Sequence, residues 1–223
     1  MKLILNSLFL IFLFLCGSCF SQNIDKSYTI KVSGFTIGKA HWKTSMDETN
    51  YINHIKIESG GVLSILYNFS GEYFSEGRVG SNGLIPTKYT HYWKTKKIVK
   101  KMNLIFKKNK LTNLEQKPLE KERIRIDVFD IVGPKDPLTS FLQIVMGKKE
   151  SLVVDGRRLY TMVSSFNSKE NRSLVEITNY SNLWADHKRN KFEKIVFEKR
   201  QGEFLPFTII IYFDGRVFKL QEN

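Results

Sequence analysis

Short runs of alternating apolar and polar residues, separated by turn-forming residues, fill nearly all of the chain after residue 21. Such alternation is typical of strands with one buried face, because successive side chains of a strand point to opposite faces of a sheet. Asn-Gly at 82–83 and Asp-Gly at 155–156 and 214–215 mark tight turns, since these residues tolerate a positive φ. The pattern predicts a mainly β protein of sequential antiparallel strands.

Several segments carry more specific expectations. The alternation of Tyr28–Val32 changes phase after Ser33-Gly34, which predicts a bulge or bend there. The run Val62–Phe69 is apolar enough for a fully buried strand, the polar stretch Leu114–Glu122 predicts a loop, and the alternation in Ile124–Val128 predicts another strand. Later strands are predicted at Ser151–Val154, Arg158–Phe166, Ser173–Asn179, Phe192–Arg200, Phe207–Phe213 and Arg216–Leu220.

One segment has the signals of a helix. Asp136 is suited to cap a helix amino terminus, and Pro137 fits the first helical position, where its missing N–H has no helical partner. Gly147 ends the run, and the apolar residues at helical spacing before it are Leu138, Phe141, Leu142 and Val145. We therefore predict a single strongly curved antiparallel sheet or barrel with one short helix, at about residues 136–146, packed on or plugging it.

A curved sheet of this length encloses apolar space, and such barrels often hold a small ligand. Core packing is the simpler role for the apolar residues that are candidates for the interior. These are Tyr28, Ile30, Val32, Phe35, Phe69, Tyr73, Phe141 and Trp184.

The first 21 residues have the layout of a secretory signal peptide. Lys2 gives a positive start, an unbroken apolar run covers residues 8–16, and Cys19 and Ser21 have the spacing of the −3 and −1 positions of a cleavage site. The apolar run is shorter than the roughly 20 residues that a membrane-spanning helix needs. We expect residues 1–21 to be a signal peptide and residues 22–223 to form one exported β-rich domain in the periplasm or cell envelope.

Both cysteines of the chain, Cys16 and Cys19, lie in this leader. A domain cleaved after Ser21 has no disulfide, so its stability must come from packing and sheet hydrogen bonds. Cys19 is also a candidate lipidation site because small residues precede it, although Cys16 replaces the usual aliphatic residue at −3. We expect a soluble form and keep a lipoprotein anchored at Cys19 as the alternative.

The chain is basic, with 35 Lys+Arg against 22 Asp+Glu. This balance indicates attraction to envelope lipids or anionic polymers, whereas overuse of Lys, Asn and Ile would also follow from AT-rich codons. The densest basic segment, Lys88–Lys110, contains aromatic residues as well. Its candidate ligand-binding residues are Tyr89, Trp93, Lys96, Lys97 and Lys100. The competing interpretation is a solvated hairpin whose lysines discourage edge aggregation.

Two further candidates follow the Asp-Gly turn at 155–156. Arg157 and Arg158 are suited to clamp an anionic group at a barrel mouth. A similar Asp-Gly-Arg sequence at 214–216 shows that repeated turn chemistry also accounts for them.

The sequence holds no strong catalytic or cofactor motif. It has no Gly-x-Ser-x-Gly elbow, no His-Glu-x-x-His pair and no phosphate-binding glycine loop, so we name no catalytic residue and expect no cofactor. His41 and His54 can come close across the first hairpin, but no acidic cluster accompanies them and we expect no metal site. Because a Ser–His–Asp triad assembles from distant residues, an envelope hydrolase with an unrecognised active site is the alternative function.

Several segments, in their order and spacing, resemble the bacterial exported family called domain of unknown function 3108. They are Gly34–Gly38, Ser75–Gly77, Gly83–Pro86 with Tyr89, Asp136–Phe141, Val154–Tyr160, Leu205-Pro206 and Asp214-Gly215. The likeness covers nearly all of the chain after the leader. It implies a periplasmic or envelope location, and it implies no reaction and no functional residues.

We favour a non-catalytic binding or scaffold module for a lipid-like or anionic envelope component. A nucleic-acid partner is not expected, because an exported protein rarely meets nucleic acid. Membrane contact would come through lipidated Cys19 or through the basic face. An outer-membrane barrel is disfavoured because the strands carry many lysines and the sequence has no terminal aromatic residue. The sequence leaves the oligomeric state open.

Overall fold

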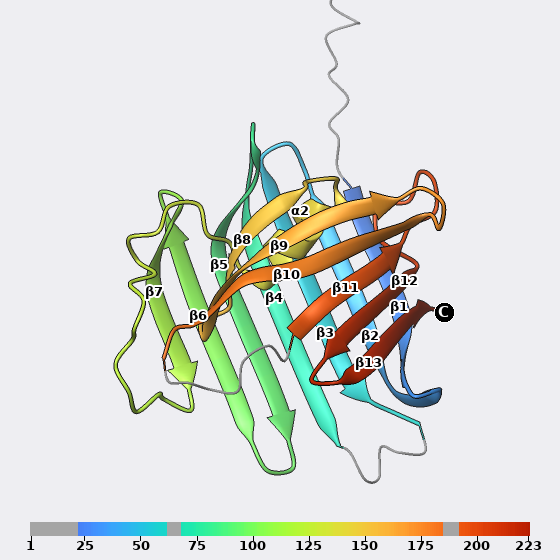
Figure 1. Ribbon diagram of the computed structural model, residues 1–223, viewed down its shortest axis with the longest axis horizontal. Coiled ribbons are helices and arrows are strands. Elements are labelled where there is room, and N and C mark those ends of the chain that lie inside the picture. Colours follow the sequence, from blue (N-terminus) through green and yellow to red (C-terminus); the bar gives the residue numbers. More distant parts are fainter. Residues whose placement is uncertain (1–21, 62–67, 185–191) are drawn as a thin grey trace, which may run out of the picture.

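The computed structural model describes residues 22–61, 68–184 and 192–223. These residues form one antiparallel sheet of 13 strands and one helix (Figure 1). The strands are β1 (Gln22–Val32), β2 (Phe35–Met46), β3 (Asn50–Ser59), β4 (Phe69–Gly80), β5 (Gly83–Thr95), β6 (Val99–Lys107), β7 (Lys110–Lys117), β8 (Glu150–Val154), β9 (Arg158–Asn167), β10 (Arg172–Asn182), β11 (Phe192–Glu198), β12 (Thr208–Phe213) and β13 (Arg216–Glu222), and the helix is α2 (Pro137–Val145). The predicted signal peptide with Cys19, and residues 62–67 of the predicted strand Val62–Phe69, lie outside the described residues.

The sheet consists of two meanders joined by the first and last strands. Strands β1 to β7 pair in sequence order, as do β8 to β13, and β1 pairs with β13 in the centre. That central pair includes Tyr28 opposite Glu222 and Val32 opposite Phe218. The hydrogen bonds of this one long-range pair therefore connect the two halves of the sheet.

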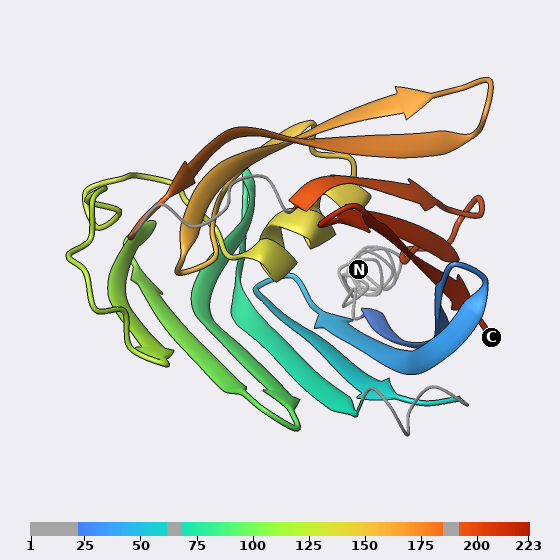
Figure 2. The same cartoon turned by 60° about the horizontal axis from the view of Figure 1, so that its bottom comes forward.

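The sheet curls strongly around α2, which lies in its interior (Figure 2). The helix contacts β4 and β5 from one half of the sheet and β8 and β9 from the other. Residues 138–145 of the helix are all buried, as expected for a helix covered on every side. The prediction of a single, strongly curved antiparallel sheet with one short helix is confirmed, and the helix begins and ends within one residue of the predicted bounds.

The edge strands β7 and β8 are not paired with each other. The chain between β7 and α2 bridges them instead: Val132 pairs with Lys110 at the edge of β7, and Lys135 pairs with Val153 at the edge of β8. Each edge strand is thereby bridged at one position.

This crossing segment corrects two sequence expectations. Ile124–Val128 forms no strand and does not join the sheet; in this segment the Arg125 amide donates a hydrogen bond to the Leu183 carbonyl. The alternation of this segment does reflect burial of its apolar residues. Val128 is fully buried, and Ile124 and Ile126 pack against the same apolar cluster. The predicted loop at Leu114–Glu122 is also wrong in its first part, because β7 continues through Lys117.

The predicted bulge or bend at Ser33-Gly34 is a complete chain reversal. Ser33 and Gly34 have φ angles of 49° and 82°, and β1 and β2 pair on either side of them. A positive φ at both central residues is the requirement of a tight type I′ hairpin turn. Phe35 then stands at the exposed tip, 65% accessible, so its predicted place in the interior is wrong. Tyr28, Ile30 and Phe141 are buried as predicted.

A buried polar cluster attaches the helix to the sheet. The Asp136 carboxylate caps α2 by accepting a hydrogen bond from the Thr139 amide at 2.9 Å, and it lies 3.0 Å from the Ser75 hydroxyl of β4. The Thr139 hydroxyl lies 2.5 Å from Asp136 Oδ2, 2.7 Å from Ser75 Oγ and 2.7 Å from the Tyr51 hydroxyl of β3. Asp136, Ser75 and Thr139 have no exposed surface.

The proton count of this cluster agrees with a raised pKa of Asp136. Four O···O contacts join Asp136, Thr139, Ser75 and Tyr51, and the three hydroxyl groups supply only three protons. If the Asp136 carboxylate were ionised, one of the four close contacts would have no proton. A neutral carboxylic acid supplies the fourth proton. Burial also raises the pKa of Asp136, although hydrogen bonds from Thr139 and Ser75 act in the opposite direction.

We therefore expect Asp136 to give the protein a stability that falls as the pH rises. The folded state keeps a proton that the unfolded state releases near the ordinary Asp pKa of about 4, so the loss begins above that pH and continues through the raised folded pKa. In Asp136→Asn the amide supplies N–H protons without titrating. Urea unfolding at mildly acidic and mildly alkaline pH should show a smaller loss for this variant than for the native chain.

Asp136→Ala is the control for the hydrogen bonds themselves. It should lower the free energy of unfolding by about 1–3 kcal/mol at mildly acidic pH, because the buried hydroxyls lose their hydrogen-bond partner. The deficit should be smaller at mildly alkaline pH, because the native chain has by then lost part of the stability that Asp136 supplies. Equal pH dependence in the native chain and in Asp136→Asn would contradict a neutral Asp136.

Candidate functional site

The tip of the β5–β6 hairpin and the chain just after β7 form a surface that we call the basic corner. It consists of residues 94–101 and 117–119, at the lower end of the sheet in Figure 1. The Thr95 hydroxyl accepts hydrogen bonds from the amides of Lys97 and Ile98, which fixes the turn. The corner exposes the side chains of Lys94, Lys96, Lys97, Ile98, Val99, Lys100, Lys101, Lys117 and Leu119.

Within the basic corner, two like charges face each other. Lys101 of β6 is the direct cross-strand partner of Lys117 of β7, an arrangement that is destabilising in a sheet. The Lys101 ammonium lies 5.5 Å from the centre of the Tyr92 ring, a contact worth about 0.5–1 kcal/mol at an exposed site. Among the described residues neither lysine forms an ion pair, so an anion bound between the two ammonium groups would reduce their repulsion.

The aromatic residues predicted for this segment face the concave side of the sheet. The Trp93 ring stacks on Phe69 at a centroid distance of 5.3 Å and crosses Gly71, where a Cβ atom would come within 2.7 Å of the indole. A glycine is thus required under Trp93. Tyr89 is 2% exposed and belongs to the core, so its predicted role in surface binding is wrong.

Two candidates from distant parts of the sequence, Lys100 and Arg157, both lie close enough to His91 to influence its charge. Both cations act on the imidazole of His91, which stacks on Tyr73 with ring centres 4.4 Å apart. Burial, followed by the charges of Lys100 and Arg157, lowers the pKa of His91 to about 4. His91 Nε2 is buried and has no hydrogen-bond partner within the described chain.

The two arginines of the predicted clamp are held by carboxylates. The guanidinium of Arg157 is bonded to Glu120 in the segment that crosses from β7. Arg158 forms an ion pair with Asp155 at 3.3 Å and lies over the Tyr180 ring. These contacts support structural roles for both residues, with Arg157 near the basic corner and Arg158 attached to its own turn.

A groove lies at the opposite rim of the sheet, past the carboxyl end of α2. It has a volume of about 980 Å³. Its lining comes from the helix end and the residues after it (Ile144, Val145, Gly147, Lys148, Lys149), from β9 to β11 (Ser164, Ser165, Phe166, Asn171, Ser173, Phe197) and from the loop after β11 (Lys199, Arg200, Gln201, Gly202, Glu203).

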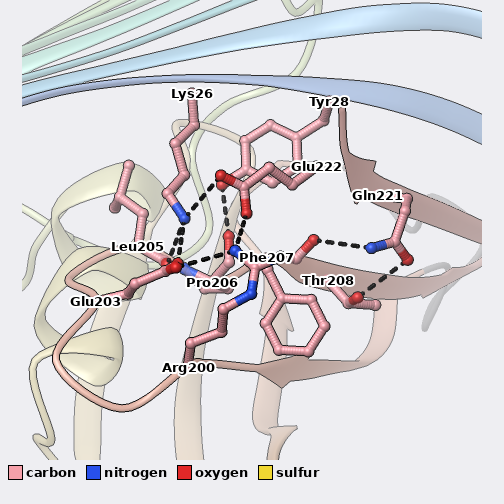
Figure 3. Close-up of polar contacts among 10 residues, drawn as sticks. All are labelled: Lys26, Tyr28, Arg200, Glu203, Leu205, Pro206, Phe207, Thr208, Gln221 and Glu222. Atoms are coloured by element: carbon pink, nitrogen blue, oxygen red, sulfur yellow. Dashed lines mark hydrogen bonds and ion pairs between the residues drawn. The ribbon is translucent and has the colours of Figure 1, made fainter.

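One wall of the groove is fixed by a closed ring of four charges, drawn in Figure 3. Lys26 of β1 contacts Glu203 at 2.5 Å and Glu222 of β13 at 3.1 Å, and Arg200 contacts the same two carboxylates at 2.9 and 2.8 Å. The hydrogen bonds from Lys26 and Arg200 lower the pKa of Glu203. The ring holds the loop after β11 against the central strand pair.

Sequence reasoning missed this groove. The adjacent basic residues Lys148-Lys149 and Lys199-Arg200 were visible as pairs at the ends of predicted elements. Their convergence depends on the packing of β9–β11 over the helix end, which no local pattern indicates.

The histidines of the described residues form no catalytic or metal-binding constellation. His41 Nδ1 contacts Ser27 Oγ at 2.9 Å on an exposed strand face, and no carboxylate bonded to this imidazole is found in the described chain. His54 contacts Glu72 at 2.8 Å. No group of three or more His, Cys, Asp or Glu side chains suited to a metal ion is found in this part of the chain. Its one helix is too short to cross a membrane.

Comparisons with known proteins give no function. No protein-family model matches the chain, and no curated protein matches it. A solved structure, the crystal structure of a beta-barrel-like protein of domain of unknown function DUF1849 from Brucella abortus, aligns with 90% of this chain and 95% of that chain. The sequence identity is 9% and the TM-score is 0.48. The resemblance to the 3108 family stays a prediction.

We expect the His91 imidazole to remain neutral until the pH approaches 4, because burial and two nearby cations disfavour its charged form. NMR titration of the imidazole protons measures this value directly. Lys100→Gln should raise the pKa of His91, since it removes one of the cations. Lys107→Gln, an exposed charge at the far end of β6, should leave it unchanged. Titration of His91 near the ordinary value of about 6.5 in the native chain would contradict this environment.

Proposed function

We propose that this chain is an exported, non-catalytic module that docks on an anionic lipid surface of the cell envelope through the basic corner. The observation that carries the proposal is the concentration of exposed lysines in one corner, namely Lys94, Lys96, Lys97, Lys100, Lys101 and Lys117, beside exposed apolar side chains. Opposed lysines such as Lys101 and Lys117 also occur elsewhere in the sheet, at Lys31 and Lys219 and at Lys107 and Lys110, so it is the density of lysines that distinguishes the corner. An anionic surface converts the same charges into favourable contacts, worth about 1 kcal/mol per residue near a membrane.

The apolar residues of the corner favour a lipid surface over a soluble polyanion. Ile98, Val99 and Leu119 are 50%, 43% and 79% exposed at the tip of the hairpin and just beyond β7. Apolar tips surrounded by lysines suit the interface of a bilayer, where apolar groups enter the acyl boundary and cations remain among the head groups. A polyanion would use the lysines and leave these three side chains in water.

Export is the other part of the proposal, and it is supported by the leader. Residues 1–21 combine a positive start, an apolar run and a small-residue cleavage pattern. In an envelope compartment the basic corner would face membranes rich in anionic groups. The hydrolase alternative gains no support from the described residues, whose one serine–histidine contact, at Ser27 and His41, lacks the third group that orients a catalytic base.

The vesicle test uses the chain without residues 1–21 and two kinds of liposome, one containing an anionic phospholipid and one purely zwitterionic. We expect cosedimentation with the anionic vesicles only, and a loss of binding as salt rises, since exposed charges are screened. Replacing Lys96, Lys97, Lys100 and Lys101 with Gln should weaken the partition onto anionic vesicles by at least about tenfold, on the scale of about 1 kcal/mol per lysine.

The matched control carries the same change of net charge elsewhere. Its four Lys→Gln substitutions are at exposed positions outside the corner, namely Lys39, Lys107, Lys108 and Lys219. This variant should retain most of the binding. Equal loss in both variants would mean that net charge alone attracts the protein, and unchanged binding in the corner variant would refute the docking surface.

The fate of the leader is tested by the intact mass of the protein isolated from its native envelope. Cleavage after Ser21 should give a cysteine-free domain that begins at Gln22. A mass that retains residue 19 with added acyl groups would instead identify the lipoprotein form. A mass that retains the whole leader would refute export by a cleaved signal.

A further inference from the structure

The groove exists because α2 is short relative to the strands around it. A nine-residue helix is about 14 Å long, whereas β9 and β10, with 10 and 11 residues, extend over about 33–36 Å. The helix therefore covers only part of the concave face. Beyond its carboxyl end, the inward-facing residues of β9 to β11 have no covering element among the described residues, and they form the floor of the groove.

The floor of the groove has an aromatic side chain at each end and a small side chain in the middle. Phe166, Ser173 and Phe197 are consecutive cross-strand partners on β9, β10 and β11, so they lie side by side on one face of the sheet. Phe197 is buried, whereas Phe166 is 65% exposed. A small residue between two aromatic rings leaves a channel in which an extended hydrocarbon chain can contact both rings.

The rim is cationic. Lys148, Lys149 and Lys199 line the groove and form no ion pair within the described chain. The one acid in the lining, Glu203, is already bonded to Lys26 and Arg200. Lys199 is also half-buried, and this burial lowers its pKa. A half-buried ammonium without a carboxylate is costly, and an anion in the groove would offset that cost.

A structural role accounts for part of this charge. Lys199 donates a hydrogen bond to the Val145 carbonyl at 3.0 Å, which caps the negative end of the helix, and Lys148 donates to the Asn82 carbonyl at 3.2 Å. One cation is enough for the half charge of a helix terminus. The second and third lysines, and the exposed ring of Phe166, are not explained by capping.

We propose that this groove binds a single anionic amphiphile, with its charged head group at Lys149 and Lys199 and its hydrocarbon chain over Phe166, Ser173 and Phe197. The volume of about 980 Å³ lies at the upper end of the range of small-molecule sites, about 300–1,000 Å³. The groove and the basic corner lie at opposite rims of the sheet, so this inference is independent of the docking surface proposed above.

The test is titration calorimetry of the chain without residues 1–21, with dodecyl phosphate below its critical micelle concentration. We expect dodecyl phosphate to bind. Inorganic phosphate and dodecanol should each bind at least about tenfold more weakly, because inorganic phosphate lacks the hydrocarbon chain and dodecanol lacks the anionic head group. Equal affinity for inorganic phosphate and dodecyl phosphate would overturn the amphiphile assignment.

Variants locate the site. Lys149→Gln with Lys199→Gln should weaken dodecyl phosphate binding about tenfold or more through loss of the charged contacts. Phe166→Ser, at a largely exposed position, should weaken the binding of dodecyl phosphate and leave the binding of inorganic phosphate unchanged. The control Lys107→Gln with Lys108→Gln, outside the groove, should bind like the native chain.

Two outcomes would refute the site. One is native affinity in both groove variants, and the other is a loss of dodecyl phosphate binding in the basic-corner variant equal to the loss in the groove variants. Retention of dodecyl phosphate binding by the basic-corner variant, whatever its affinity for vesicles, supports a separate groove site.

Discussion

The buried contact between Asp136 and the hydroxyls of Thr139 and Ser75 determines where everything else can lie. Leaving a fully buried polar group unpaired lowers the stability of the fold by about 1–3 kcal/mol. A shift of the helix would break several of these hydrogen bonds at once, and would therefore be strongly disfavoured. Apolar packing alone would allow α2 to slide along the concave face. The polar cluster fixes its amino end against β4 and thereby fixes the point at which its carboxyl end stops, which is where the groove begins.

The second constraint is the pairing of the first and last strands. All other strand pairs join neighbours in sequence, whereas the β1–β13 pair closes nearly the whole chain. The ring of Lys26, Glu203, Arg200 and Glu222 reinforces this pair at one end and orders the loop after β11 (Figure 3). Since that loop forms a wall of the groove, the same contacts that connect the two halves of the sheet also shape the proposed ligand site.

The fold class was predictable because its signals are local. Alternation and turn residues indicate strands, and Asp136-Pro137 indicates a helix start, whatever lies elsewhere in the chain. The predictions that failed depended on which distant residues meet in the folded chain. Ile124–Val128 has the pattern of a strand but is not part of the sheet, and Tyr89 has a lysine-rich sequence context but a buried position. The opposition of Lys101 and Lys117 and the approach of Lys100 and Arg157 to His91 depend on register and curl, which single-sequence patterns do not encode.

The two basic surfaces differ in burial, and this difference predicts different physical behaviour. The lysines of the basic corner are exposed, so their attraction for anions is long-ranged, screened by salt and insensitive to the shape of the partner. Lys199 lies half-buried beside a helix end, where the local dielectric is lower and a bound anion must fit the surrounding groove. Exposed charge at one rim suits reversible attachment to a surface, whereas half-buried charge beside an apolar floor at the other rim suits the binding of a single small molecule. Because the helix covers only part of the concave face, one sheet presents both kinds of basic surface.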